Sequence, residues 1–420
     1  MNRRIKALGV LAAATATALV ATACDSSGDG GGGTASKEVI VGVDLPFQGS
    51  SKDASDSTWN AMNLYLKQIG NKAGDYKVTL KKYDDSTAAA GKWTEAQCAK
   101  NANDHVATAN EVAVMGTYNS GCAQQEVTVL NQDPSGPLLM VSHANTYPGF
   151  TKAWEPSEPG KWYPTGTKNY ARVVTTDDFQ GKAAAQMAAA DLGVKNCLVL
   201  DDTETYGKGV AKQFNDEAVK KGVKTITDAW DGKAPNYNAL FNKAKSAGVD
   251  CVFFGGVYDN NGGQLIKDKV RILGDNKAVK VITPDGWVGY PDFLKQPEAE
   301  GVYQTFPGLG LSDLSKTAIT GKFLEDYKKE YGKDPDSPYA LYGVQALQVI
   351  LSAIEKSDGT RKSVTSQVLG GSGITIPADK AILGKEIKID PATGDVNAID
   401  MTIQTITGGK ETTIKAWPVQ

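Results

Sequence analysis

From residue 38 onward, short apolar runs alternate with longer amphipathic segments. The short runs have the length and composition of buried strands, and the longer segments repeat apolar residues every three or four positions. In residues 57–70, for example, Trp59, Met62, Leu66 and Ile69 recur at helical spacing. This first stretch of pattern predicts strands at 39–43, 76–83, 111–115 and 138–141, and helices at 57–70, 93–108 and 124–131.

The same alternation starts again in the second half of the chain. It predicts strands at 197–200, 225–227, 251–254 and 279–282, and helices at 207–221, 237–247 and 264–273. Strands that alternate with helices build parallel sheets covered on both faces. The chain is therefore expected to form two α/β lobes of the doubly wound, Rossmann-like kind, joined by a short hinge.

The last hundred residues do not fit a simple division into an N-terminal and a C-terminal lobe. They predict two helices, at 317–331 and 339–356, followed by strands at 385–389 and 401–406 around a turn sequence at 391–395. We therefore expect the later elements to return and complete both lobes.

The first residues have the pattern of a secretory signal. Residues 1–23 contain Arg3, Arg4 and Lys6, no acidic residue, an apolar stretch at 7–20 and a small-residue end before Cys24. The apolar stretch is shorter than the roughly 20 residues that a membrane span needs. We expect residues 1–23 to be a signal peptide that is removed.

Cys24 stands where a bacterial lipobox has its lipidated cysteine, although Ala21 replaces the usual leucine. Residues 24–37 are rich in glycine and serine, a composition typical of a flexible tether. We expect a lipid anchor at Cys24 and an extracytoplasmic body near the membrane. The alternative is a secreted protein with a free Cys24.

Composition excludes several classes of protein. Removing the three positive charges of the signal from a net charge of −3 leaves −6, and the pI is 5.7, so a nucleic-acid partner is not expected. Two histidines and the lack of a Cys-x-x-Cys motif argue against a metal site. The aspartate pairs at 84–85 and 201–202 are expected to cap turns, and His105, in a polar helical stretch, is expected to be solvated.

Four cysteines remain once Cys24 is set aside. Four cysteines allow three pairings, and two in each predicted lobe favour Cys98–Cys122 and Cys197–Cys251. The alternative is four buried free thiols.

Several short motifs follow the predicted strands in a fixed order. They are Tyr83-Asp84-Asp85, Val114-Met115-Gly116 with Ser120, Ser142-His143-Ala144-Asn145-Thr146, Tyr206-Gly207-Lys208-Gly209, Phe253-Phe254-Gly255-Gly256 and Pro284-Asp285-Gly286. In this order and spacing, residues 38–420 resemble the type I periplasmic binding proteins, specifically the leucine/isoleucine/valine-binding proteins of ABC importers.

The resemblance implies two lobes joined by three crossings, near 172–176, 303–307 and 399–401. Lobe one would comprise 38–173 plus 306–398, and lobe two 176–303 plus 401–420. The ligand would be trapped in the cleft when the hinge closes. Members of the family often have a disulfide that ends beside the ligand-binding serine, which matches Cys98 and Cys122.

Site residues can also be argued from chemistry. Ligands of open α/β sheets bind beyond the carboxyl ends of the strands, where all of these motifs lie. Residues Ser120, Gly121 and Cys122 lead into a helix, whose N-terminus can accept a carboxylate. Ser120 matches the family's ligand-binding serine; the alternative is a simple helix N-cap. The second loop contributes Ala144, Asn145 and Thr146.

Across the cleft, Asp285 matches a family glutamate that holds the ligand's ammonium group. The alternative is a turn aspartate in Pro-Asp-Gly. Tyr206 matches a tyrosine that lines the cleft, or else is a packed aromatic before a helix. Val257 replaces a ligand-contacting tyrosine, with Tyr258 adjacent, and Ala54 replaces an aromatic that covers the ligand.

The segment 154–164 looks longer than the family's usual connection. It is expected either to form a lip over the cleft or to be an insertion packed on the surface. His143 is expected to be a loop residue near the cleft.

The resemblance implies a monomeric lipoprotein that captures an amino acid, or a small amide-like solute, and delivers it to an ABC permease without chemistry or cofactor. No catalytic motif is present: neither a Gly-x-Ser-x-Gly elbow nor a Walker loop occurs. Two alternatives stay open, a ligand-sensing receptor subunit for a membrane signalling partner and a secreted amide hydrolase.

Overall fold

The computed structural model describes residues 37–397 and 401–417, which fall in one compact unit. The predicted signal peptide and Cys24 lie outside the described residues. Of the predicted tether, only Lys37 is described, and it begins the first strand.

The first half of the chain forms a six-stranded sheet in the order β2-β3-β1-β6-β7-β8. Its strands are β1 (Lys37–Leu45), β2 (Lys72–Ala73), β3 (Tyr76–Asp84), β6 (Glu111–Gly116), β7 (Leu139–Ser142) and β8 (Tyr170–Arg172). All neighbours pair in parallel except the short β2, which pairs antiparallel with β3. All four strands expected from the first run of the pattern are present.

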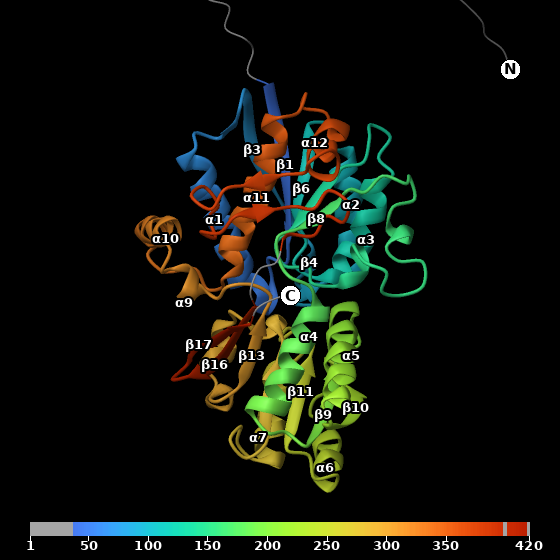
Figure 1. Ribbon diagram of the computed structural model, residues 1–420, viewed down its shortest axis with the longest axis vertical. Helices are drawn as coiled ribbons and strands as arrows, with labels where there is room; N and C mark the ends of the chain where they lie inside the picture. Colours follow the sequence, from blue (N-terminus) through green and yellow to red (C-terminus); the bar gives the residue numbers. More distant parts are fainter. Residues whose placement is uncertain (1–36, 398–400, 418–420) are drawn as a thin grey trace, which may run out of the picture. The chain divides into compact units, whose positions relative to one another are not determined.

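Helices cover both faces of this sheet (Figure 1). One face carries α1 (Lys52–Gln68), α11 (Tyr339–Glu355) and α12 (Arg361–Leu369), and the other carries α2 (Glu95–Ala107) and α3 (Ser120–Asn131). Helix α11 is buried along almost its whole length, because α1, α12 and the sheet surround it. The sequence pattern placed the start of α3 four residues too late, at 124.

The second sheet has seven strands in the order β10-β9-β11-β12-β13-β16-β17. They are β9 (Asn196–Asp201), β10 (Lys224–Ala229), β11 (Cys251–Gly255), β12 (Lys280–Thr283), β13 (Tyr303–Phe306), β16 (Met401–Thr407) and β17 (Lys410–Trp417). The strands up to β13 are parallel, and β16 and β17 are added antiparallel.

Two helix layers also enclose the second sheet. Helices α4 (Asp177–Gln186) and α5 (Thr205–Lys220) share one core with Phe253, and α6 (Asn238–Ser246) and α7 (Gly262–Leu273) share the other with Phe254. Adjacent strand residues point to opposite faces, so this Phe-Phe pair of β11 supplies both cores.

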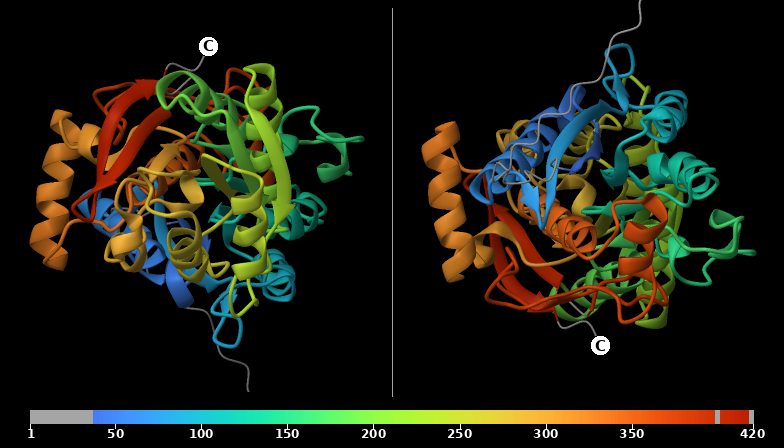
Figure 2. Two further views of the ribbon diagram at one scale, coloured as in Figure 1. Left: turned by 90° about the horizontal axis from the view of Figure 1, so that it is seen from below. Right: turned by 90° about the horizontal axis from the view of Figure 1, so that it is seen from above.

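The remaining elements are short or peripheral. They are β4 (Ser86–Thr87), β5 (Lys92–Trp93), β14 (Thr375–Ile376), β15 (Ile387–Lys388), α8 (Pro291–Leu294), α9 (Leu311–Leu314) and α10 (Ala318–Tyr331). Helix α10 lies beside the β16–β17 hairpin in both views of Figure 2.

The sequence pattern missed several elements and predicted another to be longer than it is. The strand expected at 385–389 is only the two-residue β15, paired with β14 in a separate small sheet. Helix α4 was not expected because its buried residues are alanine, glycine and two polar residues, Asp177 and Gln180, which give no strong apolar stripe. Strand β13 is too short to show a period, and β17 alternates exposed and half-buried residues at the sheet edge.

The chain passes between the two sheets more than once. After β8 of the first sheet it enters α4 on the second, and after β13 of the second sheet it enters α11 on the first. A further passage precedes β16, and the crossing expected at 399–401 lies mostly outside the described residues. The lobe boundaries given above stay predictions.

Both expected disulfides are present. Cys98 of α2 pairs with Cys122 of α3, and Cys197 of β9 pairs with Cys251 of β11. The alternative of four free thiols is therefore wrong. Among the described residues, no helix is both long and apolar enough to cross a bilayer.

Candidate functional site

A small cavity lies where the carboxyl ends of strands from both sheets meet. Its volume is about 20 Å³, which is room for about one water molecule. The residues that line it are Tyr118, Asn119, Ser120, Gly121, Ala144, Glu204, Tyr206, Val257, Asp285 and Gly286. Loops after β6 and β7 supply the first five, and loops after β9, β11 and β12 supply the others.

The wall from the first sheet is the N-terminus of α3. Ser120 is the first residue of this helix, and the N-cap position is occupied by Asn119. The alternative of a simple N-cap role for Ser120 therefore does not describe the structure. The first amides of a helix have no acceptor within the helix and bear its positive dipole end. Ser120 and Gly121 thus offer a wall that favours an anion.

Asn119 adds a polar atom to this wall. Its side chain is buried, and Oδ1 has no hydrogen-bond partner among the described residues. A buried polar atom without a partner is uncommon and destabilising. Asn119 lines the cavity, so a ligand that donates a hydrogen bond could satisfy it.

The wall from the second sheet carries acidic side chains. Asp285 is buried, and its Oδ1 accepts hydrogen bonds from Gln180 Nε2 and from the Tyr206 hydroxyl, both at 2.6 Å. Its Oδ2 accepts a hydrogen bond of 2.5 Å from the Tyr339 hydroxyl. These partners are neutral, and burial raises the pKa of Asp285 despite them. A ligand cation would stabilise the ionised carboxylate.

A second acid lies behind Asp285. Asp177, at the start of α4, is fully buried and shares the Gln180 amide with Asp285. Burial, followed by the nearby charge of Asp285, raises the pKa of Asp177 well above its usual value. The second wall therefore has more acidic character than one aspartate provides.

Six of the predicted site residues line the cavity: Ser120, Gly121, Ala144, Tyr206, Val257 and Asp285. Tyr206 is the second residue of α5, and its hydroxyl accepts a hydrogen bond of 3.0 Å from Gly286 N while donating to Asp285. Burial raises the pKa of Tyr206 well above its usual value, so it stays a donor.

Four of the predicted residues lie outside the cavity lining. Cys122 is held in its disulfide, and Asn145 Nδ2 donates to the carbonyls of Thr117 and Tyr118. The backbone carbonyl of Thr146 accepts a hydrogen bond from the backbone N–H of Asp177. Tyr258 packs among aromatic residues of the second sheet, and its hydroxyl accepts from Gln296.

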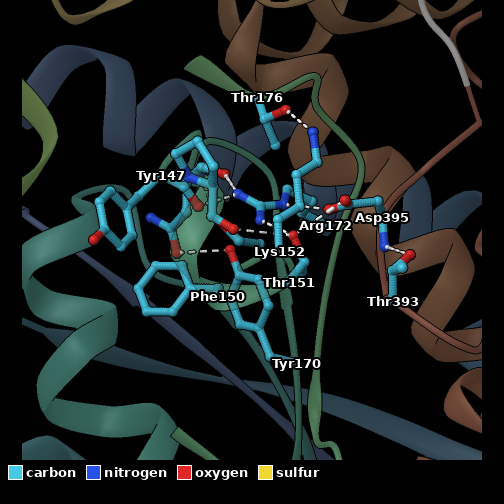
Figure 3. Close-up of polar contacts among 12 residues, drawn as sticks. Tyr147, Phe150, Thr151, Lys152, Tyr170, Arg172, Thr176, Thr393 and Asp395 are labelled. Atoms are coloured by element: carbon cyan, nitrogen blue, oxygen red, sulfur yellow. Dashed lines mark hydrogen bonds and ion pairs between the residues drawn. The ribbon is translucent and has the colours of Figure 1, made fainter. Parts of the chain in front are cut away.

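Arg172 holds the loop after β7, which contains Ala144, Asn145 and Thr146, in place (Figure 3). Its buried guanidinium donates to the carbonyls of Asn145 and Tyr147 at 2.9 and 2.8 Å, and to Thr151 Oγ1 at 2.6 Å. It also pairs with Asp395 at 2.8 Å. Arg172 is the last residue of β8, next to the crossing expected near 172–176, and Asp395 lies just before the crossing expected near 399–401. The network therefore connects the loop that contains Ala144 to both of these segments.

Polar contacts join the two sides around the cavity. Lys92 Nζ lies 2.7 Å from Glu204 Oε1, and Trp93 Nε1 donates to Glu204 Oε2 at 3.1 Å. A second contact between the two sides joins the loop after β1 to the loop after β11: Ser51 Oγ donates to Asp259 Oδ2 at 2.5 Å. These contacts hold the two sides together, and the cavity between them has room for only about one water molecule, so a larger solute needs the two sides to move apart.

The segment 154–164 packs on the outside of the first lobe. Trp162 Nε1 donates to the Gly149 carbonyl, Tyr163 OH donates to the Phe150 carbonyl, and both rings adjoin the core beside α3. Of the two expected arrangements, the structure shows the packed insertion.

The two histidines are both buried. His105 is 0% exposed, so the prediction that it is solvated was wrong: folding of α2 over the sheet covers it. His143 has ring centroids 6.2 Å from Tyr118 and 5.7 Å from Tyr339, and burial lowers its pKa to about 3. The His143 imidazole is therefore neutral. His143 is not among the residues that line the cavity.

The sequence reasoning missed four lining residues: Tyr118, Asn119, Glu204 and Gly286. Each is within two positions of a residue that was predicted, so the motif after each strand was found and its extent was underestimated. Tyr339 and Gln180, which fix Asp285, come from elements distant in the sequence and had no local signal.

Comparison with known proteins agrees with this arrangement. The family described as "Periplasmic binding protein" matches residues 38–410. A leucine-, isoleucine-, valine-, threonine- and alanine-binding protein of Pseudomonas aeruginosa is 26% identical over 306 residues, which cover 71% of this chain and 74% of the relative. The Leu/Ile/Val-binding protein BraC3 of Rhizobium johnstonii is 24% identical, with 89% and 93% covered.

Two solved structures show the same fold. The leucine-binding protein LivK of Thermotoga maritima superimposes with a TM-score of 0.73 at 20% identity, covering 90% of this chain and 99% of the other. A solute-binding protein of an ABC transporter from Rhodopseudomonas palustris HaA2, in complex with p-hydroxybenzoic acid, gives a TM-score of 0.74 at 15% identity, covering 91% and 98%.

Proposed function

The chain belongs to the periplasmic binding protein family, and from that membership we propose that it is the extracytoplasmic solute-binding component of an ABC importer that captures a free amino acid. The solute would sit between lobe one (38–173 plus 306–398) and lobe two (176–303 plus 401–420) and be trapped by closure of the hinge. The protein would then present it unchanged to a membrane permease.

One observation carries the choice of ligand: Asp285 faces the N-terminus of α3 across the same cavity. The helix terminus and Ser120 suit a carboxylate, and the buried Asp285 suits an ammonium group. An α-amino acid has both charges on neighbouring carbons. The named relatives that bind leucine, isoleucine and valine support this ligand class.

The relative that holds p-hydroxybenzoic acid suggests a different ligand, an aromatic carboxylate. Such a ligand would use the helix terminus but leave the buried Asp285 without a cation. A buried carboxylate without a charged partner is unfavourable, and a second anion nearby makes it more so. The acidic wall therefore favours the zwitterion.

Binding is tested by thermal shift and calorimetry on the purified protein. Leucine, isoleucine, valine, alanine and threonine form one set of solutes, and benzoate and small uncharged amides form the others. Members of the first set should raise the Tm, because binding to the native state stabilises it by mass action. A shift with benzoate or amides alone would contradict the amino-acid assignment.

Further measurements test the two alternative functions, the amide hydrolase and the receptor subunit. Mass spectrometry of the recovered solute should find it intact, whereas conversion to product would indicate the amide hydrolase. In cells, loss of the protein should abolish uptake of the labelled amino acid. Normal uptake with loss of a transcriptional response would favour the receptor subunit.

Anchoring and assembly complete the proposal. The body is tethered through a lipid on Cys24 by residues 24–37, and it acts as a monomer. Labelled fatty acid should enter the protein and should not enter Cys24→Ser. Light scattering after gel filtration should give the mass of one chain.

A further inference from the structure

A second cluster of chemically active side chains lies away from the cavity, between the first sheet and helices α2 and α3. Its members are Asp44 of β1, Asp85 after β3, His105 of α2, Glu111 of β6 and Glu126 of α3, and all are 0% exposed. Four carboxyl groups thus share one water-free space with one imidazole.

The available partners do not balance this charge. Asp44 accepts from Asn101 Nδ2 and lies 3.1 Å from His105 Nε2, and Glu111 accepts from the Tyr83 hydroxyl. Both carboxyl oxygens of Asp85, and Oε2 of Glu126, have no hydrogen-bond partner among the described residues.

The nearest arginine does not supply the missing charge. Arg361 donates to the carbonyls of His105, Thr108 and Glu111, and its ion pair is with Asp133. Ionised carboxylates that are buried without partners are strongly unfavourable, and the cluster therefore needs either protons or a cation.

The donor atoms are arranged as in a metal site. One carboxylate oxygen of Asp44, one nitrogen of His105 and one carboxylate oxygen of Glu126 all lie within 4.8 Å of one another. The 3.1 Å between Asp44 Oδ2 and His105 Nε2 is close to the separation of two ligands on one small ion whose bonds are about 2.0–2.2 Å long.

The surroundings of His105 point the same way. Its Nδ1 is hydrogen-bonded to Glu111, and Glu111 is itself fixed by Tyr83 at 2.6 Å. A carboxylate on one ring nitrogen sets the tautomer and leaves the other nitrogen, here Nε2, to bind a metal. The Asp44 carboxylate lies 3.1 Å from Nε2, and Glu126, whose Oε2 is unsatisfied, belongs to the same group of donor atoms.

We propose that this cluster is a structural site for one divalent transition-metal ion, with His105 Nε2, Asp44 and Glu126 as ligands. An imidazole with carboxylates suits Zn²⁺ or Mn²⁺, whereas Ca²⁺ and Mg²⁺ prefer oxygen alone. Because the cluster is buried, the ion enters as lobe one folds and joins α2 and α3 to β1.

The first test measures metal in the wild-type protein. The full chain is unfolded in guanidinium with a chelator, refolded with Zn²⁺, with Mn²⁺ or with neither, and desalted through chelator. Elemental analysis should find about one ion per chain from at least one metal, because a buried ion exchanges slowly, and the metal-loaded protein should have a higher Tm. Retention of less than about a tenth of an ion per chain from both metals would overturn the proposal.

The second test uses matched variants. His105→Gln and Glu126→Gln should each lower metal retention at least about tenfold, as the loss of a ligand does. Asp202→Asn, which alters an equally buried carboxyl group in the second lobe, should retain the ion. Retention in all three variants would place the ion elsewhere and refute the site.

X-ray absorption of the zinc-loaded wild type keeps the test decisive if the variants do not fold. The expected spectrum has nitrogen and oxygen ligands only, with the signature of one imidazole. A shell containing sulfur, or one without imidazole, would refute the assignment. None of these measurements depends on the amino-acid ligand, so the proposed transport function and this site can fail separately.

Discussion

The hydroxyl of Tyr339 donates a hydrogen bond of 2.5 Å to Asp285 Oδ2. Tyr339 begins α11 and packs in the core of the first lobe, while Asp285 follows β12 of the second sheet. The carboxylate proposed to hold the ligand's ammonium is therefore also a contact between the two sides of the cleft. Ligand binding and closure are connected through this one side chain.

Asp285→Asn is expected to weaken amino-acid binding strongly, because a buried charge partner of the ammonium group is lost. Truncating such a pair costs about 2–5 kcal/mol, which is roughly 30-fold to several-thousand-fold in Kd. Calorimetry measures the Kd, and the Tm of the ligand-free protein should not fall, since a buried acid is removed. Unchanged affinity would exclude Asp285 from the site.

Ser120→Ala should weaken binding by roughly 10- to 150-fold, because a hydrogen bond to a charged group contributes about 1.5–3 kcal/mol. The matched control is Thr317→Ala, which removes the N-cap of α10 that accepts from Thr320 N at 3.3 Å. The control should lower stability by about 1 kcal/mol and leave the Kd unchanged. Equal affinities for both variants would contradict a ligand role for Ser120.

The two disulfides should differ in their effect on binding. Replacing Cys98 and Cys122 by alanine should lower the free energy of unfolding by about 2–4 kcal/mol and also weaken binding, because Cys122 fixes the helix turn that begins at Ser120. Replacing Cys197 and Cys251 should lower stability by a similar amount without affecting the Kd, since this bridge joins neighbouring strands. Denaturant unfolding and calorimetry distinguish the two.

Arg172→Lys should destabilise the protein by about 3–5 kcal/mol, because lysine cannot replace the guanidinium toward Asp395 and the loop carbonyls (Figure 3). Arg271→Lys is the control: Arg271 is exposed and its pair with Asp268 contributes under about 1 kcal/mol. The urea midpoint measures both. A shift for Arg172→Lys no larger than that of the control would show that the network does not stabilise the fold.

Stability should also depend on pH through Glu411. Burial raises the pKa of Glu411 to about 7 from 4.5, although its Oε1 accepts a hydrogen bond of 2.8 Å from Gly289 N. A carboxyl group with a raised native pKa contributes stability that is complete below pH 4.5 and is lost as the pH rises through 7.

The difference between wild type and Glu411→Gln isolates this contribution. Between these two pH values, the free energy of unfolding of the wild type should fall by up to about 3 kcal/mol more than that of the variant. Unfolding in urea at a series of pH values measures it. Parallel pH profiles for the two proteins would show that Glu411 does not titrate in this range.

The positions of the strand-end loops could be predicted because their signals are local. An apolar run followed by small and polar residues marks the end of a buried strand, and parallel strands place these ends at one edge. The resemblance to binding proteins then assigned Ser120, Ala144, Tyr206, Val257 and Asp285 within these loops to the ligand site, and all five line the cavity. Their roles toward a ligand stay predictions.

Tertiary structure alone decided which distant residues complete those loops. Tyr339 reaches Asp285, and Arg172 reaches Asp395, from elements far away in the sequence. The environment of His105 was likewise hidden, because a polar helical stretch looks solvated until it is packed over buried carboxylates. By itself, the sequence determined most of the long strands and helices and the loops between them, because periodicity and turn residues act over a few positions. Burial, charge pairing and pKa depend on neighbours in space, and only the packed chain brings those neighbours together.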